Sequence, residues 1–193
     1  MFTNSKDFWE KRYTIGDNSG NGSYGLLAEF KAKIINEIIR DNNIETVGEF
    51  GCGDGNQLSM LVLDKYTGYD VSNNILHKCN TKFSNDKTKK FLNISDYSND
   101  KFELSMSLDV IYHLVEDEVF ENHMKMIFSS SNKHVIIYSS DFNEKGTYHV
   151  KHRKFTLWIE KNIKDFKLIN FIKNEYPKKS SADFFIYKKI SKI

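Results

Sequence analysis

The segment Glu49-Phe50-Gly51-Cys52-Gly53-Asp54-Gly55 carries the clearest chemical signal in this chain. Closely spaced glycines let a ligand touch the main chain, and free N–H groups can hold an anionic group where a strand leads into a helix. A dinucleotide-binding loop would have its third glycine at position 56, which is asparagine here. Glu49 would serve a pyrophosphate poorly, but it suits an ammonium group. We therefore interpret this loop as a site for an α-amino acid group.

A second carboxylate, Asp70, ends the next predicted strand, 19 residues after Gly51. In nucleotide-binding α/β folds, a carboxylate at this place holds the hydroxyl groups of a ribose. A loop for an amino acid group, followed by a carboxylate for a ribose, matches the two halves of S-adenosylmethionine.

Hydrophobic periodicity predicts the elements that must position these groups. Apolar residues three and four apart predict a helix over 26–40, which precedes a short buried strand over 46–50. Further helices are expected over 56–63, 73–83 (capped by Ser72), 118–128 and 155–163, and further strands over 66–70, 90–93, 102–108 and 134–138. Two β-rich runs, 166–176 and 183–190, flank a turn at 177–181 and predict a hairpin.

This order of elements predicts an α/β fold with a mostly parallel sheet, helices wrapped around it, and an antiparallel hairpin at the C-terminal edge. We expect one domain over residues 1–193. Residues 1–45 would form a helical cap or lid, and residues 46–193 would form the core.

The overall composition excludes several other classes of protein. With 39% hydrophobic and 14% aromatic residues, the chain can bury a core and is not disordered. A net charge of +2 does not demand a polyanionic partner. Two cysteines are too few to staple a domain of this size, so a reducing cytoplasm is the expected location. Neither a signal peptide, nor a membrane span, nor the ligand spacing of a metal site is expected.

Three motifs together resemble the class I S-adenosylmethionine-dependent methyltransferase family, in its small bacterial and phage form. They are E-F-G-C-G-D-G at 49–55, G-Y-D-V-S at 68–72 and L-S-M-S-L-D-V-I-Y-H-L at 104–114. The resemblance covers about residues 46–138. It implies a three-layer Rossmann-like fold with a seven-stranded sheet, S-adenosyl-L-methionine as the cofactor, and S-adenosyl-L-homocysteine as the product.

The resemblance also implies a set of cofactor-binding residues at the ends of the first four strands. Glu49 would serve the amino group, Asp70 the ribose, and a group after the third strand the adenine edge. The full set is Glu49, Gly51, Cys52, Gly53, Asp70, Val71, Ser95, Asp96, Tyr97 and Leu108.

The methyl acceptor is expected beside Asp109 and His113, the candidate catalytic residues. His113 is a candidate general base, although a packing role is the plainer alternative. The expected substrate-binding residues are Trp9, Arg12, Tyr13, Ser23, Tyr24, Tyr112, His149, His152 and Arg153. In the cluster His149–Arg153, the arginine suits a phosphate or carboxylate, although a solvated basic turn has the same composition.

These features predict a methyltransferase that acts on an oxygen of a small anionic or hydroxylated metabolite. A phosphate- or sugar-containing intermediate of bacterial surface polysaccharide biosynthesis is one such acceptor. The alternatives are an RNA or tRNA methyltransferase, which the basic tail 174–193 favours, and a cofactor-binding subunit of a methyltransferase complex. The N/D-P-P-Y/F motif of many base-amine methylases is absent after the fourth strand, where 108–111 reads L-D-V-I. We expect a monomer or homodimer with a small-molecule acceptor and no membrane or metal partner.

Overall fold

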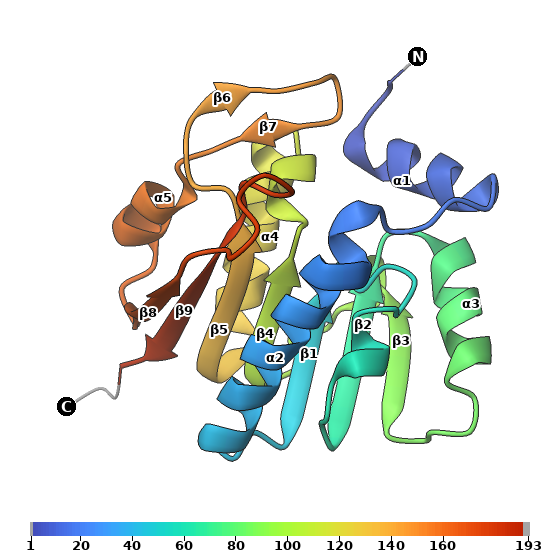
Figure 1. Ribbon diagram of the computed structural model, residues 1–193, viewed down its shortest axis with the longest axis horizontal. Coiled ribbons are helices and arrows are strands. Elements are labelled where there is room, and N and C mark those ends of the chain that lie inside the picture. The colour runs from blue at the N-terminus through green and yellow to red at the C-terminus, as the bar shows by residue number, and fades with distance from the viewer. Residues whose placement is uncertain (1, 191–193) are drawn as a thin grey trace.

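A seven-stranded sheet with helices on both faces forms the body of the protein (Figure 1). The computed structural model describes residues 2–190. The strands of the sheet are β1 (Thr46–Phe50), β2 (Lys65–Asp70), β3 (Lys89–Asn93), β4 (Phe102–Leu108), β5 (Ser131–Ser139), β8 (Phe166–Ile172) and β9 (Asp183–Lys189). The α-helices are α1 (Ser5–Thr14), α2 (Gly25–Asp41), α3 (Asn73–Lys82), α4 (Asp117–Ser129) and α5 (Phe155–Asn162).

The strand order is β3-β2-β1-β4-β5-β9-β8. Strands β1 to β5 pair in parallel, whereas β9 runs antiparallel to both β5 and β8. The predicted α/β fold with its C-terminal antiparallel hairpin is therefore confirmed. The order reverses between β1 and β4, and open α/β sheets bind ligands beyond the carboxyl ends of their strands at such a point.

Each face of the sheet carries its own hydrophobic cluster, which gives the fold three layers. Helices α2 and α3 pack on one face, and α4 and α5 pack on the other. In β1, Val47 belongs to the first cluster and Phe50 to the second. Because strand side chains alternate between faces, Glu49 points to the α2 and α3 side. The same alternation places Asp70 on that side, because its neighbour Tyr69 belongs to the opposite cluster.

The helix predicted over 56–63 is wrong: this segment contains only a 3₁₀ turn, η2 (Leu58–Met60). Local and tertiary hydrogen bonds of this segment compete with a helix. Ser59 Oγ donates to the carbonyl of Asn56 at 2.6 Å, and the N–H of Val62 donates to Asn36 of α2 at 2.8 Å. The glycine loop consequently has no α-helix N-terminus behind it.

Two further features differ from the sequence prediction. A separate two-stranded sheet, β6 (Glu144–Lys145) with β7 (Lys151–His152), interrupts the connection from β5 to α5. The first strand of the C-terminal hairpin ends at Ile172 rather than at residue 176.

Figure 1 shows α1 lying beyond the carboxyl ends of the parallel strands. Within residues 2–190, no helix combines the length and hydrophobicity that a membrane crossing requires.

Candidate active site

The glycine loop after β1 adopts a conformation that only glycine accommodates easily. Gly51 has a φ of +93° and Gly53 a φ of +54°. A Cβ on Gly51 would lie 2.4 Å from Val110 Cγ2, and one on Gly53 would lie 2.3 Å from Ser19 Oγ. The glycines therefore let the segment after β4 and the N-terminal segment approach the main chain of the loop.

Asp70 holds this loop in place from the end of β2. Its carboxylate accepts hydrogen bonds from the N–H groups of Gly53 and Ser72, each at 3.0 Å. Burial raises the pKa of Asp70 to about 6, while these backbone bonds act in the opposite direction. The two bonds leave acceptor capacity on both carboxylate oxygens.

Glu49 is buried at the centre of the sheet, with 3% of its surface exposed. The hydroxyl of Tyr66 donates to its Oε2 at 2.6 Å. Burial raises the pKa of Glu49 to about 7, while Tyr66 and the charge of Lys31 lower it. Glu49 is therefore an acceptor whose ionised form a nearby cation would strongly stabilise.

Lys31 of α2 and Asp109 form a buried ion pair that sequence reasoning missed. Lys31 Nζ lies 2.6 Å from Asp109 Oδ2, and the lysine side chain is 1% exposed. Asp109 follows β4 with a φ of +59°, unusual for a residue other than glycine, and its Oδ1 accepts from Tyr112 at 2.8 Å. The sequence does contain a clue that Lys31 is buried. It lies four residues from both Leu27 and Ile35, so it belongs to the apolar face of the helix.

The segment between α1 and α2 closes over the glycine loop through Asp54. Its Oδ2 accepts from the N–H of Ser19 at 2.9 Å and from the hydroxyl of Tyr24 at 2.8 Å. In return, the N–H of Asp54 donates to Ser19 Oγ at 2.9 Å. Tyr13 of α1 is buried beside these groups, and burial together with the charge of Asp70 raises its pKa.

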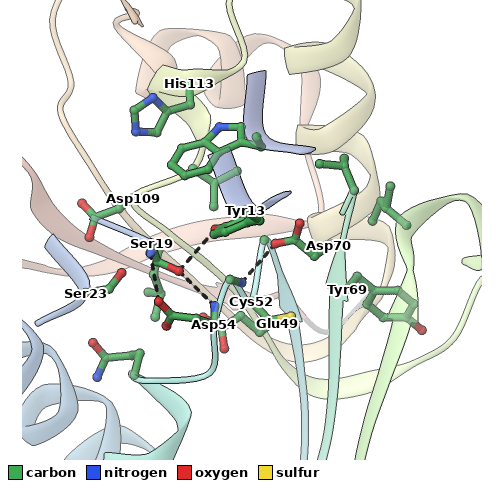
Figure 2. Close-up of a pocket in the computed structure, with 18 of the residues that line it drawn as sticks. Tyr13, Ser19, Ser23, Glu49, Cys52, Asp54, Tyr69, Asp70, Asp109 and His113 are labelled. Atoms are coloured by element: carbon green, nitrogen blue, oxygen red, sulfur yellow. Dashed lines mark hydrogen bonds between the residues drawn. The ribbon is translucent and has the colours of Figure 1, made fainter. Parts of the chain in front are cut away.

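These residues surround a cavity beyond the ends of β1, β2 and β4 (Figure 2). Its polar part contains Glu49, Asp70, Asp109 and Lys31, together with Gln57. Gln57 is 5% exposed, and its Oε1 has no hydrogen-bond partner among the described residues. The other part is mainly apolar and is lined by Tyr69, Val71, Ile94, Leu108, Val110, Leu114 and His123.

A second cavity adjoins the first and shares Trp9, Ser19, Asp109 and His113 with it. Its remaining lining comes from α1, the segment 17–22, Tyr112 and His149. Aromatic contacts order its wall: the rings of Phe8 and His149 stack with centroids 4.5 Å apart, and Trp9 meets His113 edge-on at 4.9 Å. The site therefore has two connected compartments with Asp109 and His113 at their junction.

His113 is a neutral imidazole with one free nitrogen. Its Nδ1 lies 3.2 Å from the backbone carbonyl of His149, which can only accept, so Nδ1 carries the proton and Nε2 has the free lone pair. Burial is the main cause that lowers the pKa of His113 to about 4. His113 can therefore accept a hydrogen bond at neutral pH, but it is a weak base.

Most predicted cofactor-binding residues line the first cavity, namely Glu49, Gly51, Cys52, Gly53, Asp70, Val71 and Leu108. The adenine group is displaced: Ile94 lines the cavity, whereas Ser95, Asp96 and Tyr97 do not. Ser95 and Asp96 are exposed, and the ring of Tyr97 packs edge-on against Phe50 and Tyr69. The role of these three positions at the adenine edge therefore stays a prediction, and in the structure Ser95 and Asp96 belong to the 3₁₀ turn η3 (Ile94–Asp96).

Among the predicted substrate-binding residues, Trp9, Tyr13 and Ser23 line the first cavity, and Trp9, Arg12, Tyr112 and His149 line the second. Tyr24 lines neither, because its hydroxyl is bound to Asp54. His152 also lies outside both, where its Nδ1 is 2.6 Å from Ser140 Oγ and its ring stacks on Phe142.

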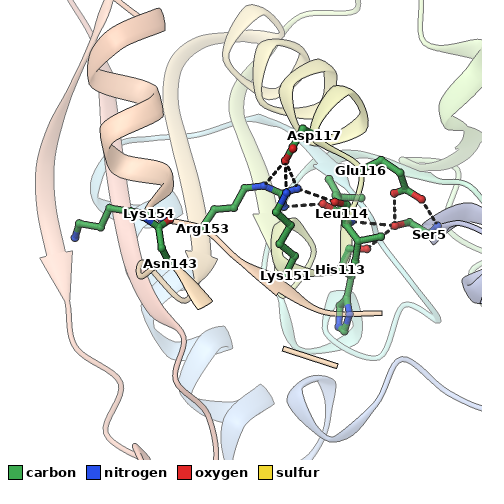
Figure 3. Close-up of polar contacts among 10 residues, drawn as sticks. Ser5, His113, Leu114, Glu116, Asp117, Asn143, Lys151, Arg153 and Lys154 are labelled. Atoms are coloured by element: carbon green, nitrogen blue, oxygen red, sulfur yellow. Dashed lines mark hydrogen bonds and ion pairs between the residues drawn. The ribbon is translucent and has the colours of Figure 1, made fainter. Parts of the chain in front are cut away.

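Arg153, predicted to bind an anion of the acceptor, lines neither cavity, and its guanidinium contacts groups of the protein itself (Figure 3). Its guanidinium donates to the carbonyls of Leu114 and Val115 at 2.7 and 3.0 Å, and to Asp117 at 2.8 Å. It also lies over the ring of Phe120, 4.6 Å from the centroid. Through these contacts the guanidinium links the segment before α5 to the segment 114–117 at the start of α4.

Solved structures share this fold across nearly the whole chain. N-methyltransferase NodS from Bradyrhizobium japonicum WM9, in complex with S-adenosyl-L-homocysteine, aligns with a TM-score of 0.75 at 12% identity over 98% of this chain and 100% of that one. Magnesium protoporphyrin IX methyltransferase from Synechocystis PCC 6803, with bound SAM, aligns with a TM-score of 0.70 at 13% identity over 97% and 98%. An S-adenosylmethionine-dependent methyltransferase from Clostridium acetobutylicum ATCC 824 gives 0.65 at 14% identity over 96% and 97%.

No protein-family model matches the sequence, and no curated protein matches it. At identities of 12–14%, the structural matches establish a shared fold. The chain thus has the Rossmann-like fold of the class I S-adenosylmethionine-dependent methyltransferases, as its motifs predicted.

Proposed function

We propose that this protein is an S-adenosylmethionine-dependent methyltransferase that methylates an oxygen of a small hydroxylated metabolite. One observation carries the proposal: a cavity with buried carboxylates at the strand ends adjoins a second cavity, and Asp109 and His113 line both. The first compartment suits the cofactor, and the second suits an acceptor that must reach the cofactor from one side.

The residues of the first cavity fit S-adenosylmethionine in three places. Glu49 and the unpartnered Oε1 of Gln57 are buried acceptors for an ammonium group. Asp70 retains acceptor capacity for ribose hydroxyls, and Val71 with Ile94 offers apolar walls for adenine. When bound, S-adenosylmethionine supplies an electrophilic methyl group on a sulfonium centre.

The charge of the first cavity also suits a cationic ligand. Among the described lining residues, four carboxylates (Glu49, Asp54, Asp70 and Asp109) face one ammonium group, that of Lys31. Histidine does not change this balance at neutral pH, because burial lowers the pKa of both His113 and His123 to about 4. Buried carboxylates stabilise a positive charge more strongly than they would in water.

The protein contributes to methyl transfer mainly through alignment and exclusion of water. Tyr13 and Ser19 cover the glycine loop, and Trp9 forms a wall shared by the two compartments. Holding two reactants in line in a dry site can supply a large part of the rate enhancement. We therefore propose that residues 1–45 act as a lid over the core.

The acceptor cavity favours a hydroxyl group over an anion. Arg12 is the permanent cation among the described residues that line it, and it already pairs with Asp17 at 3.1 Å and donates to the carbonyl of Asn18. Burial and the charge of Arg12 also lower the pKa of His149, which disfavours its charged form. Sugars are hydroxylated acceptors of this kind, and we keep a sugar intermediate of bacterial surface polysaccharide as the specific candidate.

We assign His113 the role of orienting the acceptor hydroxyl through its free Nε2. Because burial lowers its basicity, we expect His113→Gln to lower kcat by about tenfold, less than the 10²–10⁴ that a full general base contributes. A fall of a hundredfold or more with unchanged cofactor affinity would instead make His113 the base.

The proposal is tested by a screen of small hydroxylated and phosphorylated metabolites with S-adenosylhomocysteine formation as the readout. We expect turnover with hydroxylated compounds, and we expect Asp70→Ala to weaken S-adenosylhomocysteine binding by about 10- to 100-fold, as for a lost hydrogen bond to a charged group. Tight binding of NADH with none of S-adenosylhomocysteine would contradict the proposal.

A further inference from the structure

Lys31 is a buried cation whose hydrogen-bonding capacity is only partly used. Its ammonium group has three donors, of which Asp109 Oδ2 takes one at 2.6 Å. The ammonium also lies 5.3 Å from the ring centroid of Tyr138. A lysine that is 1% exposed and lines a cavity with donors to spare can hold a further acceptor in that cavity, in addition to Asp109.

Lys31 lies on the side of the sheet to which Glu49 points. Its charge acts on the Glu49 carboxylate, which takes its hydrogen bond from Tyr66 rather than from the lysine. Gln57 adds a buried acceptor without a partner to the same cavity. One end of the cavity therefore presents two acceptors for a cation and one donor for an anion. This is the pattern that complements an α-amino acid zwitterion.

The glycine loop itself cannot supply the positive charge for a carboxylate. In α/β folds an anion is often held at the N-terminus of the helix that follows the loop. Here that helix is replaced by the 3₁₀ turn η2, and two N–H groups of the loop, those of Gly51 and Cys52, already donate to the carbonyl of Tyr69. Among the described residues that line this cavity, Lys31 carries the only ammonium group.

We propose that Lys31 binds the α-carboxylate of S-adenosylmethionine and makes the site selective for ligands with a complete amino acid group. This inference rests on the proposed function, because it assumes that the first cavity is the cofactor site. It adds a specificity-determining residue, and it predicts rejection of the decarboxylated form of the cofactor.

The test is calorimetric binding of two ligands to the wild type and to Lys31→Met. The ligands are S-adenosylhomocysteine and S-adenosyl-(3-thiopropyl)amine, which lacks only the carboxylate. We expect the wild type to prefer S-adenosylhomocysteine by about 10- to 100-fold, as for a charge-assisted hydrogen bond. In Lys31→Met this preference should shrink to within about threefold, on the same reasoning. Affinity for the amine should stay unchanged or rise, because the substitution removes a repelling cation.

Lys33→Met is the matched control, because Lys33 is exposed on the same helix and should leave both affinities unchanged. Lys31→Met leaves Asp109 buried without its cation, so Lys31→Met/Asp109→Asn is measured alongside it in case the single variant does not fold.

Two results would overturn the inference in different ways. Equal weakening of both ligands by Lys31→Met, or equal wild-type affinity for both, would exclude recognition of the carboxylate by Lys31 while leaving the proposed function intact. Failure of the wild type to bind either ligand would contradict the proposed function, and this inference with it.

Discussion

Lys31 and Arg153 are both largely buried cations near the carboxyl end of the sheet, yet their surroundings differ. Lys31 has one protein acceptor and lines a cavity with unpartnered polar groups. Arg153 donates to two backbone carbonyls and to Asp117, and it covers the ring of Phe120. Lys31 therefore keeps donors available for a ligand, whereas the hydrogen bonds of Arg153 are made within the protein.

The same contrast separates the glycine-loop cavity from the segment 141–154. In the cavity, Glu49 and Asp70 are ionisable groups held at an energetic cost, as their raised pKa values show. In the segment, polar groups meet protein partners: Lys154 pairs with Asp141 at 2.6 Å, and His152 with Ser140. We therefore expect substitutions in the cavity to change ligand binding, and substitutions of His152, Arg153 or Lys154, which line neither cavity, to change stability alone.

Substitution of Gly51 should have the largest effect. In Gly51→Ala the new Cβ would lie 2.4 Å from Val110 Cγ2, and the backbone of residue 51 would have to keep a φ of +93°. We expect a loss of about 3 kcal/mol in the free energy of unfolding, from the strained backbone and the overpacked contact together. Denaturant unfolding measures this loss. Gly16→Ala is the matched control, because Gly16 has a similar φ of +86° with no atom near its Cβ, so it should lose only about 1 kcal/mol.

Arg153→Met tests the other region and should lower the free energy of unfolding by about 2 kcal/mol. The loss comes from the bonds to the carbonyls of Leu114 and Val115, which would be left without donors. Affinity for S-adenosylhomocysteine should stay within about twofold, because the cofactor partners are untouched. Lys151→Met removes only an exposed pair with Asp117 and should cost less than about 0.5 kcal/mol. A selective rise in acceptor KM for Arg153→Met, without loss of stability, would restore the anion grip.

Asp54 should matter for retention of the ligand rather than for folding. Asp54→Ala removes the acceptor that holds Ser19 and Tyr24 over the glycine loop. We expect S-adenosylhomocysteine to dissociate about tenfold faster, the equivalent of about 1.4 kcal/mol, in stopped-flow measurements. Asp64→Ala removes an exposed carboxylate that lines neither cavity, and it is the control. An unchanged dissociation rate for Asp54→Ala would show that this segment is not a lid.

The pH dependence of binding should report Glu49. Its pKa is raised to about 7, so below pH 7 its carboxyl is mainly protonated and cannot pair with an ammonium group. Affinity for S-adenosylhomocysteine should therefore fall about tenfold between pH 8 and pH 6, since a proton must be removed before pairing. Calorimetry in buffers of different ionisation enthalpy should show proton release on binding at pH 7. Glu49→Gln should bind weakly and without this pH dependence; the same slope in that variant would assign the proton to another group.

Asp96→Asn should have the smallest effect. Asp96 is exposed and does not line the cavity, so affinity for S-adenosylhomocysteine should change by less than about twofold. A tenfold loss in a calorimetric titration would show that Asp96 reaches the adenine edge after all, and that the cavity extends beyond its present lining.

The part of the site that the sequence predicted depends on short-range pattern. Glu49 and Asp70 stand at the ends of buried strands, and parallel pairing of β1 with β2 brings those ends together without further information. The position of Asp109 could be predicted in the same way, because it directly follows β4, which pairs in parallel with β1. The motif positions and the strand pattern therefore agree with the cavity.

The rest depends on contacts between distant segments. The missing helix after the glycine loop reflects competition from Asn36 of α2, and the partners of Arg153 come from residues 114–117. Lys31 has an ordinary helical position, and only the approach of Asp109 from β4 makes it part of the site. Such pairings are set by tertiary packing, which local propensity does not specify.

The central claim is that the first cavity holds the cofactor with its amino acid group between Lys31 and Glu49. A crystal structure of the protein grown with S-adenosylhomocysteine tests it most directly. We predict the carboxylate within hydrogen-bond distance of Lys31 Nζ, the ammonium beside Glu49 and Gln57, and the adenine between Val71 and Ile94. Density for the ligand outside this cavity, or with its amino acid group turned away from Lys31, would contradict the claim.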